Sequence, residues 1–420
     1  MIQTPRVVIL GGGLAGVRIA LWLSRHQAPE ECIVTLVDRA SEHVYPPVLY
    51  EVATAFNPFE REAVGKVLHE TAAVPFSRIF DGSRVVFLQR SVERIVSATR
   101  TVHFTNGETL PAEILVFALG SQLAIFGVPG VDTNAFSIKT LPEAAELRHH
   151  LVRQFLRYRS ASRNRQERAF CVAVVGGGSA GVELAAEFAV FLRRLAWLHR
   201  VDPDVCRVFL FEAGDTILRE CPPQLRERGL ARLRTLGVQL LPRESVCAVG
   251  PDHLSCSGGM FLQTDTIVWL AGIRTHDVLL RSGLPVHARG GLYADHTLAV
   301  RGFPDIFAAG DCVYAADPQT GRIVPDVAYA AVQQGAVVAQ NILRKLRGQP
   351  LISYIDHPRP TYTTVGGKFA LVHLPPWQFA GRVGWTVKQL ADLRYLFSVL
   401  PNDVAFRAWG KSVRVRVAND

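Results

Sequence analysis

The sequence predicts an α/β protein with two Rossmann-like domains followed by a C-terminal α-helical segment. Two apolar runs, residues 6–10 and 171–175, resemble buried parallel strands, and each is followed at once by a glycine-rich loop and an apolar helix. In both places a second apolar strand follows, at residues 33–37 and 207–211, and an acidic residue ends it. A strand–loop–helix–strand unit that occurs twice in one chain indicates a duplicated domain.

Length and composition agree with this fold class. At roughly 150 residues per domain, 420 residues suggest two or three domains. Hydrophobic residues make up 49% and charged residues 20%, which is typical of a globular protein with a real core. The net charge of +9 is not gathered in a dense Lys/Arg run, so we expect no nucleic-acid partner. The longest nearly uncharged stretch, residues 169–192, contains four glycines and two glutamates, so we expect no membrane-spanning helix.

The cysteines argue against disulfide chemistry. There are seven, and none are spaced as C-x-x-C, which favours reduced thiols and a cytoplasmic protein. No His/Cys group has the spacing of metal ligands, so we expect no metal site.

The first glycine-rich loop has the G-x-G-x-x-G spacing at Gly11, Gly13 and Gly16. These glycines permit a tight turn, close approach of the backbone to a pyrophosphate, and close packing of helix on strand. The helix N-terminus then presents unpaired N–H groups to phosphate. Asp38 ends the second strand, where a carboxylate accepts hydrogen bonds from ribose hydroxyls. We therefore expect a dinucleotide site that also includes Leu14, Ala15 and Arg39.

The second loop repeats the pattern at Gly176, Gly178 and Gly181, and Glu212 ends its second strand. A carboxylate at this position favours a free 2′-hydroxyl and repels a 2′-phosphate, which predicts NADH rather than NADPH. The alternative for Glu212 is a solvated acid at the end of a strand.

Two further features lie close to these units. Glu183 falls in the expected first helical turn, where it either complements the helix dipole or lies near the nicotinamide. Gly310 and Asp311 follow an apolar strand at residues 306–309, and an acid at that edge can bind a sugar or ribityl hydroxyl. The helix expected at residues 328–346 could direct its N-terminus at a flavin ring.

The order of the two glycine loops and the late Gly-Asp pair resembles the flavoproteins with two dinucleotide-binding domains. Within them the chain is most similar to the type II NADH dehydrogenases, which are non-pumping NADH:quinone oxidoreductases. The resemblance covers nearly the whole chain and is carried by residues 43–53, 175–185, 269–273 and 307–312. It implies that the first loop and Asp311 bind FAD, and that the second loop binds NADH. It adds Gly120 and Gly272 to the cofactor-binding residues.

The resemblance also implies a quinone site. The family's helix reads A-Q-x-A-x-Q, and here Tyr329 replaces the first Gln while Gln333 matches the second. We expect Tyr329 and Gln333 to border the quinone, with Glu183 near the nicotinamide and Lys368 as a further candidate. The alternative for Gln333 and Gln334 is a pair of amides on a helix surface. A second departure is Leu119, where the family has Thr.

The C-terminal segment has a composition of its own, rich in aromatic residues, Pro and Arg. Leu390, Leu393, Phe397 and Leu400 recur at helical spacing, and a shorter helix after Asn402 carries Phe406 and Trp409 among basic residues. We expect Lys388, Asp392 and Arg394 to occupy the opposite, polar face. This pattern suits an amphipathic helix on an anionic membrane surface, and the alternative is a helix in the core or in a dimer interface.

Together these features predict a peripheral enzyme on the cytoplasmic face of the membrane, and we expect a homodimer. The expected domains are an FAD-binding domain (residues 1–120 and 286–348), an NADH-binding domain (121–285) and a C-terminal membrane-association or dimerisation domain (349–420). The expected activity is hydride transfer from NADH to FAD and two-electron transfer to a membrane quinone. The rival activities are reduction of ferredoxin or rubredoxin, sulfide:quinone chemistry, and non-catalytic NADH sensing by a flavoprotein.

Overall fold

The computed structural model describes residues 4–55, 69, 72–160, 168–288, 290–357 and 360–418. Contacts within the chain divide it into two units. The first contains Met1–Tyr45, Ala73–Gln122 and Ile273–Pro358, and the second contains Pro46–Ala72, Leu123–Gly272 and Arg359–Asp420. Each unit holds one of the two glycine-loop repeats.

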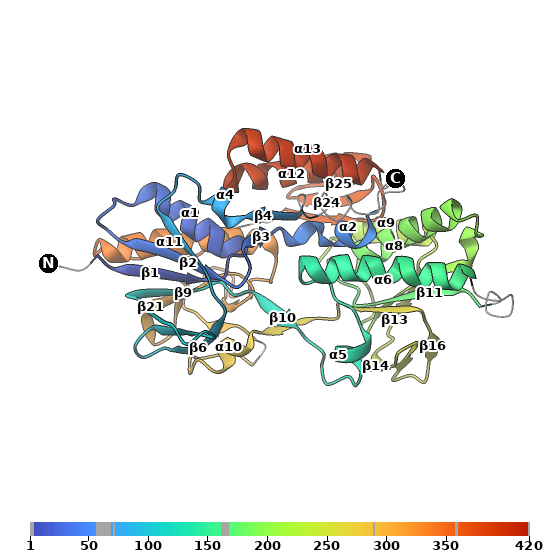
Figure 1. The fold of residues 1–420 in the computed structure, drawn as a ribbon, viewed down its shortest axis with the longest axis horizontal. Helices are drawn as coiled ribbons and strands as arrows, with labels where there is room; N and C mark the ends of the chain where they lie inside the picture. Colours follow the sequence, from blue (N-terminus) through green and yellow to red (C-terminus); the bar gives the residue numbers. More distant parts are fainter. Residues whose placement is uncertain are drawn as a thin grey trace. The chain divides into compact units, whose positions relative to one another are not determined.

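The first unit is built on a six-stranded sheet in the order β20-β21-β9-β1-β2-β5. β1 pairs in parallel with β2 and β9, and Val7–Leu10 of β1 are fully buried, as its apolar sequence predicts. Helices α1 and α11 lie side by side (Figure 1), and Gly335 permits this approach because a Cβ there would lie 2.9 Å from the Ala15 carbonyl oxygen. The elements are β1 Arg6–Leu10, α1 Leu14–His26, β2 Ile33–Asp38, β3 Glu42–Val44, β4 Ala73–Pro75, α4 Phe76–Ile79, β5 Val85–Gln89, β6 Val92–Val96, β7 Thr101–Phe104, β8 Thr109–Pro111, β9 Ile114–Phe117, β18 Ile273–Thr275, α10 Asp277–Leu280, β19 Leu292–Tyr293, β20 Ala299–Val300, β21 Phe303–Ala308, β22 Val313–Tyr314 and α11 Ala328–Leu346. β10, Ser121–Leu123, spans the boundary between the units.

The second unit repeats the arrangement with a four-stranded sheet in the order β13-β12-β11-β17. β11 pairs in parallel with β12 and β17, as β1 does with β2 and β9. In both units an antiparallel three-stranded sheet, β6-β7-β8 or β14-β15-β16, precedes the last of these parallel strands. The elements are α2 Leu49–Thr54, α5 Val131–Asn134, α6 Leu141–Ser160, β11 Phe170–Val175, α8 Ser179–Leu198, β12 Cys206–Glu212, α9 Pro223–Thr235, β13 Gln239–Pro242, β14 Val246–Val249, β15 His253–Cys256, β16 Phe261–Gln263, β17 Thr266–Trp269, β23 Thr361–Thr364, β24 Ala370–Leu374, β25 Trp377–Gly381, α12 Arg382–Val399 and α13 Asn402–Ala418.

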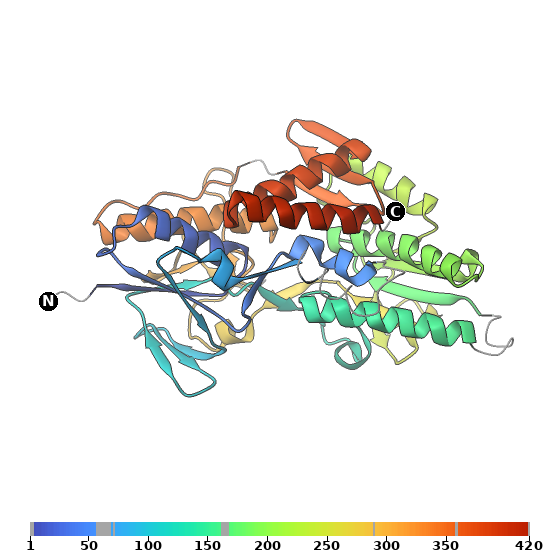
Figure 2. The ribbon, with the colours of Figure 1, turned by 45° about the horizontal axis from the view of Figure 1, so that its top comes forward.

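The C-terminal part of the second unit consists of the β23-β24-β25 sheet and two helices. Helices α12, orange-red, and α13, dark red, run beside each other (Figures 1 and 2). None of the helices in the described residues has both the length and the apolar content needed to cross a membrane.

Helix α12 buries the face that we expected to be polar and exposed. Lys388 and Asp392 are 3% and 5% exposed, whereas Leu390 and Phe397 of the apolar stripe are 55% and 41% exposed. That expectation was wrong for Lys388 and Asp392, because an ion-pair cluster with partners elsewhere in the chain compensates their burial. Arg394 is exposed, as expected, and Leu400 is buried.

Candidate functional site

The first glycine loop has the geometry that close approach to a phosphate requires. Gly11 has a φ of +103°, and a Cβ there would lie 2.3 Å from the Ala118 carbonyl oxygen. A Cβ on Gly16 would lie 1.9 Å from the Gly11 carbonyl oxygen, so the helix can pack on the strand only with glycine there. Gly13, in contrast, is exposed and has open space where its Cβ would stand. This open position at the start of α1 is where a side chain would obstruct a pyrophosphate.

The second loop reproduces these distances. Gly176 has a φ of +118°, and its Cβ would lie 2.5 Å from the Leu270 carbonyl oxygen. A Cβ on Gly181 would lie 1.8 Å from the Gly176 carbonyl oxygen, and Gly178 is exposed with open space beside it. The two loops are therefore geometrically equivalent, residue by residue.

The acidic residue that ends β2 or β12 accepts a hydrogen bond from the glycine loop of the same unit. Asp38 Oδ2 accepts a hydrogen bond from the Gly12 N–H at 2.6 Å, and Glu212 Oε2 accepts one from the Gly177 N–H at 2.8 Å. Glu212 Oε1 also accepts from Arg219 at 3.0 Å. A carboxylate has more acceptor positions than these bonds use, so ribose recognition stays compatible with the geometry. Glu212 is thus more than the solvated acid of the alternative interpretation.

The Gly-Asp pair is fixed inside the first unit. Gly310 has a φ of +77°, and its N–H donates to Gln334 Oε1 at 2.7 Å. Asp311 Oδ2 accepts a hydrogen bond from Ser121 Oγ at 2.8 Å. Ser121 directly follows Gly120, which has a φ of +67°. Gln334 is 3% exposed, so it is a buried amide that positions the Gly-Asp turn, and its interpretation as a surface amide was wrong.

Tyr329 and Gln333 lie near the start of α11. Tyr329 is 37% exposed, whereas Gln333 Oε1 is buried and has no hydrogen-bond partner among the described residues. A buried acceptor without a donor costs folding free energy, on the order of 1–3 kcal/mol, unless a ligand or water supplies the donor. This orphaned oxygen therefore fits a site for a bound group in the first unit.

Of the remaining cofactor candidates, Leu14 and Ala15 open α1, and Ala15 is buried under α11. Arg39 is exposed, and its carbonyl oxygen accepts from Gln89 Nε2 at 3.2 Å. In the second unit the Gly272 carbonyl oxygen accepts from the Ala124 N–H at 3.0 Å.

Glu183 lies one turn deeper in its helix than the sequence indicated. α8 begins at Ser179, so Glu183 is its fifth residue and no acid occupies the first turn. Its Oε1 accepts from the Thr364 N–H at 3.1 Å and the Thr364 hydroxyl at 3.3 Å. Burial raises the pKa of Glu183 to about 7, against the opposing charge of Lys388 and the Thr364 bonds. The interpretation as a dipole-complementing acid is wrong, and a carboxyl that titrates near neutral pH is suited to proton transfer.

A buried ion-pair cluster, which the sequence did not predict, lies in the same unit as Glu183. Arg416 of α13 donates to Glu51 Oε2 of α2 at 2.6 Å and to Asp392 Oδ2 of α12 at 2.7 Å. Lys388 Nζ donates to the same Asp392 oxygen at 3.0 Å, and the Tyr50 hydroxyl donates to Glu51 at 2.9 Å. Burial would raise the pKa of Asp392, but the charges of Lys388 and Arg416 outweigh it and hold that pKa below its usual value.

Lys368 lies in the turn between β23 and β24. Together with Arg232, Phe369 and Arg382 it lines an open pocket of about 420 Å³ in the second unit. The turn contains Gly366 and Gly367, both with positive φ, which is the stretch that drew attention to Lys368 in the sequence.

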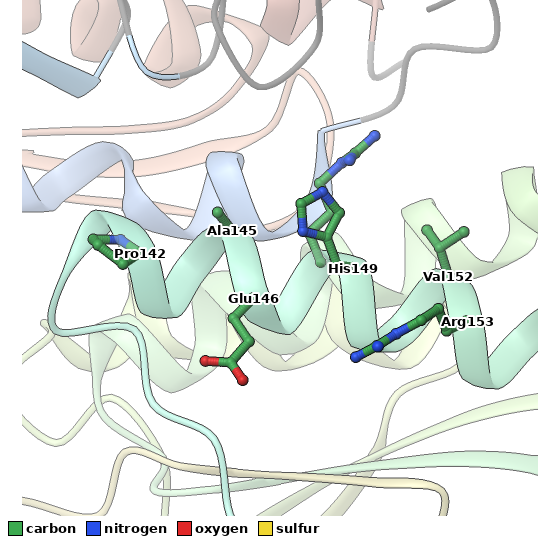
Figure 3. A pocket seen from close by; sticks show the side chains of 7 residues that line it. Pro142, Ala145, Glu146, His149, Val152 and Arg153 are labelled. Atoms are coloured by element: carbon green, nitrogen blue, oxygen red, sulfur yellow. The ribbon is translucent and has the colours of Figure 1, made fainter. Parts of the chain in front are cut away.

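A second hollow, of about 600 Å³, lies along α6 (Figure 3). Its labelled side chains, among them Glu146, His149 and Arg153, project from that one helix and carry mixed charge. None of its lining residues belongs to the glycine loops, so it is a poor candidate for the site of chemistry.

All seven cysteines lie in the described part of the chain and are unpaired. Burial raises the pKa of Cys312, next to Asp311, to about 12, so this thiol is protonated at neutral pH and a weak nucleophile. Among the described residues no group of His, Cys, Asp and Glu has the arrangement of a metal site.

Two geometrically equivalent glycine-rich loops in one chain are the features that the family comparison must explain. Residues 5–335 match the model of the pyridine nucleotide-disulphide oxidoreductase family, and the chain belongs to that family. It is thus an oxidoreductase, and it carries two equivalent glycine-rich loops.

Within the family, the similarity points to one group. The chain is 28% identical to a type II NADH:quinone oxidoreductase of Haemophilus influenzae, over 87% of this chain and 86% of the relative. It is 26% identical to one from Staphylococcus aureus, over 96% of this chain and 98% of the relative.

Solved structures give the same fold. NDH2 from Plasmodium falciparum, determined in complex with NADH, matches with a TM-score of 0.82 at 16% identity, over 98% of both chains. A sulfide:quinone oxidoreductase from Aquifex aeolicus matches with a TM-score of 0.75 at 18% identity, over 95% of this chain and 92% of that one. At these identities the structures establish the fold alone.

Proposed function

We propose that this protein is an NADH:quinone oxidoreductase that carries FAD in its first unit and binds NADH in its second. The observation that carries the proposal is the pair of equivalent glycine loops, Gly11–Gly16 and Gly176–Gly181, in a chain whose curated relatives are type II NADH:quinone oxidoreductases along nearly their full length. A bound flavin would supply the chemistry, taking a hydride equivalent from NADH and giving two electrons to a quinone.

The first unit offers each type of contact that FAD requires. The open position at Gly13 and the N–H groups that begin α1 suit the pyrophosphate, and Asp38 suits the ribose. Asp311 is held at the end of its strand, where it can accept from the ribityl chain. The buried Gln333 Oε1 is an acceptor available to an N–H of the flavin ring or to the hydroxyl of a quinol product.

The second unit offers the corresponding contacts to NADH. Gly178 would face the pyrophosphate, and Glu212 would accept from the adenosine ribose and disfavour a 2′-phosphate. Glu183, whose pKa lies at about 7, would hold or release a proton close to the nicotinamide end. Tyr329, Gln333 and Lys368 remain the candidates that border the quinone.

The surface of α12 and α13 supports a peripheral membrane location. Large apolar side chains are exposed there, among them Val383, Leu390, Phe397 and Phe406, at 59%, 55%, 41% and 57%. Outside the buried cluster of Lys388, Asp392 and Arg416, the two helices carry five exposed Lys or Arg and one exposed Asp within residues 382–418. Each basic residue close to an anionic membrane contributes about 1 kcal/mol to binding. We therefore propose attachment to the cytoplasmic face of the membrane, and a homodimer as the assembly.

The test is anaerobic. The purified flavoprotein is titrated with NADH and separately with NADPH, and flavin absorbance near 450 nm is followed; air-free quinone is then added. We expect bleaching by NADH well ahead of NADPH, and recovery of absorbance with quinone. No bleaching by NADH would refute the proposal. Bleaching without recovery by any quinone would leave the nucleotide assignment and refute the quinone as acceptor.

A further inference from the structure

Three cationic side chains meet in one pocket of the second unit. Arg232 in the last turn of α9, Lys368 and Phe369 in the β23–β24 turn, and Arg382 at the start of α12 line its volume of about 420 Å³. None of the four lining residues is acidic. Since Arg232 lies well over a hundred residues before the other three, the fold itself gathers this charge.

The pocket is preorganised. Arg232 Nε donates to the Val365 carbonyl oxygen at 3.2 Å, its Nη2 donates to the Gly366 carbonyl oxygen at 3.1 Å, and its guanidinium carbon lies 5.3 Å from the centre of the Phe369 ring. The guanidinium has five N–H donors, so these two bonds fix its orientation and leave others for a ligand. The turn passes through two glycines with positive φ, Gly366 at +71° and Gly367 at +62°, a conformation that other residues rarely adopt.

Arg382 stands where helix energetics disfavours a cation. It is the first residue of α12, the first turn contains no acid, and the N-terminus of an 18-residue helix carries the positive end of the macrodipole. An anion bound at this pocket would be favoured by the three side chains and by the dipole together.

The exposed apolar stripe of α12 begins at the next residue. Val383, Leu390 and Phe397 are seven residues apart, so they share one face of the helix, and all three are exposed. We propose that the pocket binds the phosphate of an anionic phospholipid, whose apolar part would lie against Val383. In this assignment Lys368 contacts the lipid, which leaves Tyr329 and Gln333 as the candidates that border the quinone. The chemistry recognised is a phosphate ester, and the adjacent apolar stripe favours a lipid over free phosphate as its source. The assignment rests on the membrane location in the proposed function.

The experiment uses the full-length flavoprotein and vesicles of phosphatidylcholine with or without phosphatidylglycerol, and co-sedimentation measures binding. We compare wild type with Lys368→Gln/Arg382→Gln. The control is Arg228→Gln/Arg234→Gln, which removes the same charge from exposed positions on α9 outside the pocket. A single Arg382→Lys variant, which keeps the charge, tests whether the helix N-terminus tolerates substitution. Thermal unfolding of each variant confirms that it is folded.

We expect the pocket variant to bind phosphatidylglycerol vesicles at least tenfold more weakly than wild type, the control less than threefold, and Arg382→Lys close to wild type. Equal losses in the pocket and control variants would overturn the proposal, because diffuse charge would then explain binding. Inorganic phosphate that displaces the protein from vesicles at low millimolar concentration would also overturn it, in favour of free phosphate. NADH bleaching of the flavin is recorded on the wild type in the same preparations, so failure of the proposed function is seen separately from failure of the lipid site.

Discussion

Replacing Arg416 with Met tests the buried ion-pair cluster most directly. Arg416 is the last long side chain of α13, and its side chain is 5% exposed, between Glu51 at 11% and Asp392 at 7%. Without it, these two carboxylates keep one cation, Lys388, which is bonded to Asp392. One buried charge is then unpaired, which costs about 3–5 kcal/mol.

The same helix supplies the matched control. Arg407 pairs with Asp403 four residues earlier, but the two side chains are 70% and 66% exposed. Water screens such a pair, so Arg407→Met should cost less than about 0.5 kcal/mol. In thermal unfolding, followed by circular dichroism and by flavin fluorescence, we expect the midpoint to fall by roughly 6–20 °C for Arg416→Met and by less than about 2 °C for Arg407→Met.

A double variant excludes a simple packing effect. Glu51→Gln removes the carboxylate that Arg416→Met leaves unpaired, so the double variant should regain a large part of the lost midpoint. The reasoning is refuted if the two single variants shift the midpoint equally, or if Glu51→Gln adds its cost in full to that of Arg416→Met.

The other predictions concern the two nucleotide sites. The pKa of Glu183 is raised to about 7 from an ordinary value near 4.5, so the folded protein binds more protons than the unfolded chain between about pH 4.5 and pH 7. The free energy of unfolding should therefore fall as pH rises through that window, and Glu183→Gln should flatten the decline, as measured by urea midpoints. An unchanged slope would contradict the pKa assigned to Glu183. Glu212→Ala should release Arg219 from its carboxylate and shift the ratio of NADPH to NADH use upward by tenfold or more in kcat/KM; an unchanged ratio would show that Glu212 does not select the nucleotide. Gly178→Ala should keep the fold and the FAD but raise the KM for NADH at least tenfold. Gly13→Ala should keep the fold and lose FAD, as measured by the ratio of flavin to protein. Loss of FAD in both variants would contradict the assignment of FAD to the first loop and NADH to the second.

The sequence predicted what depends on local chemistry. Both glycine-rich loops, their flanking strands and the helix at residues 328–346 were confirmed as structural elements, because a glycine at a required positive φ and an apolar run beside it leave few other conformations. Glu183 was expected in the first turn of its helix, but α8 begins at Ser179, before the last glycine of the loop, Gly181. That error produced the wrong interpretation of its role.

What the sequence did not predict depends on partners that lie far apart in the chain. Gln334 was read as a surface amide because its acceptor role needs the Gly310 N–H, 24 residues away. Arg416 and Glu51 are separated by 365 residues, and no local sequence pattern around either residue predicts their ion pair. The i, i+4 pair of Lys388 and Asp392 was visible, but such pairs usually lie on solvated surfaces.

Helix α12 buries charged side chains and exposes apolar ones, which is the opposite of the usual arrangement. A helix in water gains free energy by burying apolar side chains and exposing charged ones, and α12 does the reverse at Lys388, Asp392, Leu390 and Phe397. Burying ions requires compensation, which the Arg416 cluster supplies, whereas none of the described residues covers these exposed apolar side chains. The outward face of α12 therefore supports contact with something other than water. A lipid surface is the proposal that also accounts for the five exposed basic residues of α12 and α13, which lie outside the Arg416 cluster.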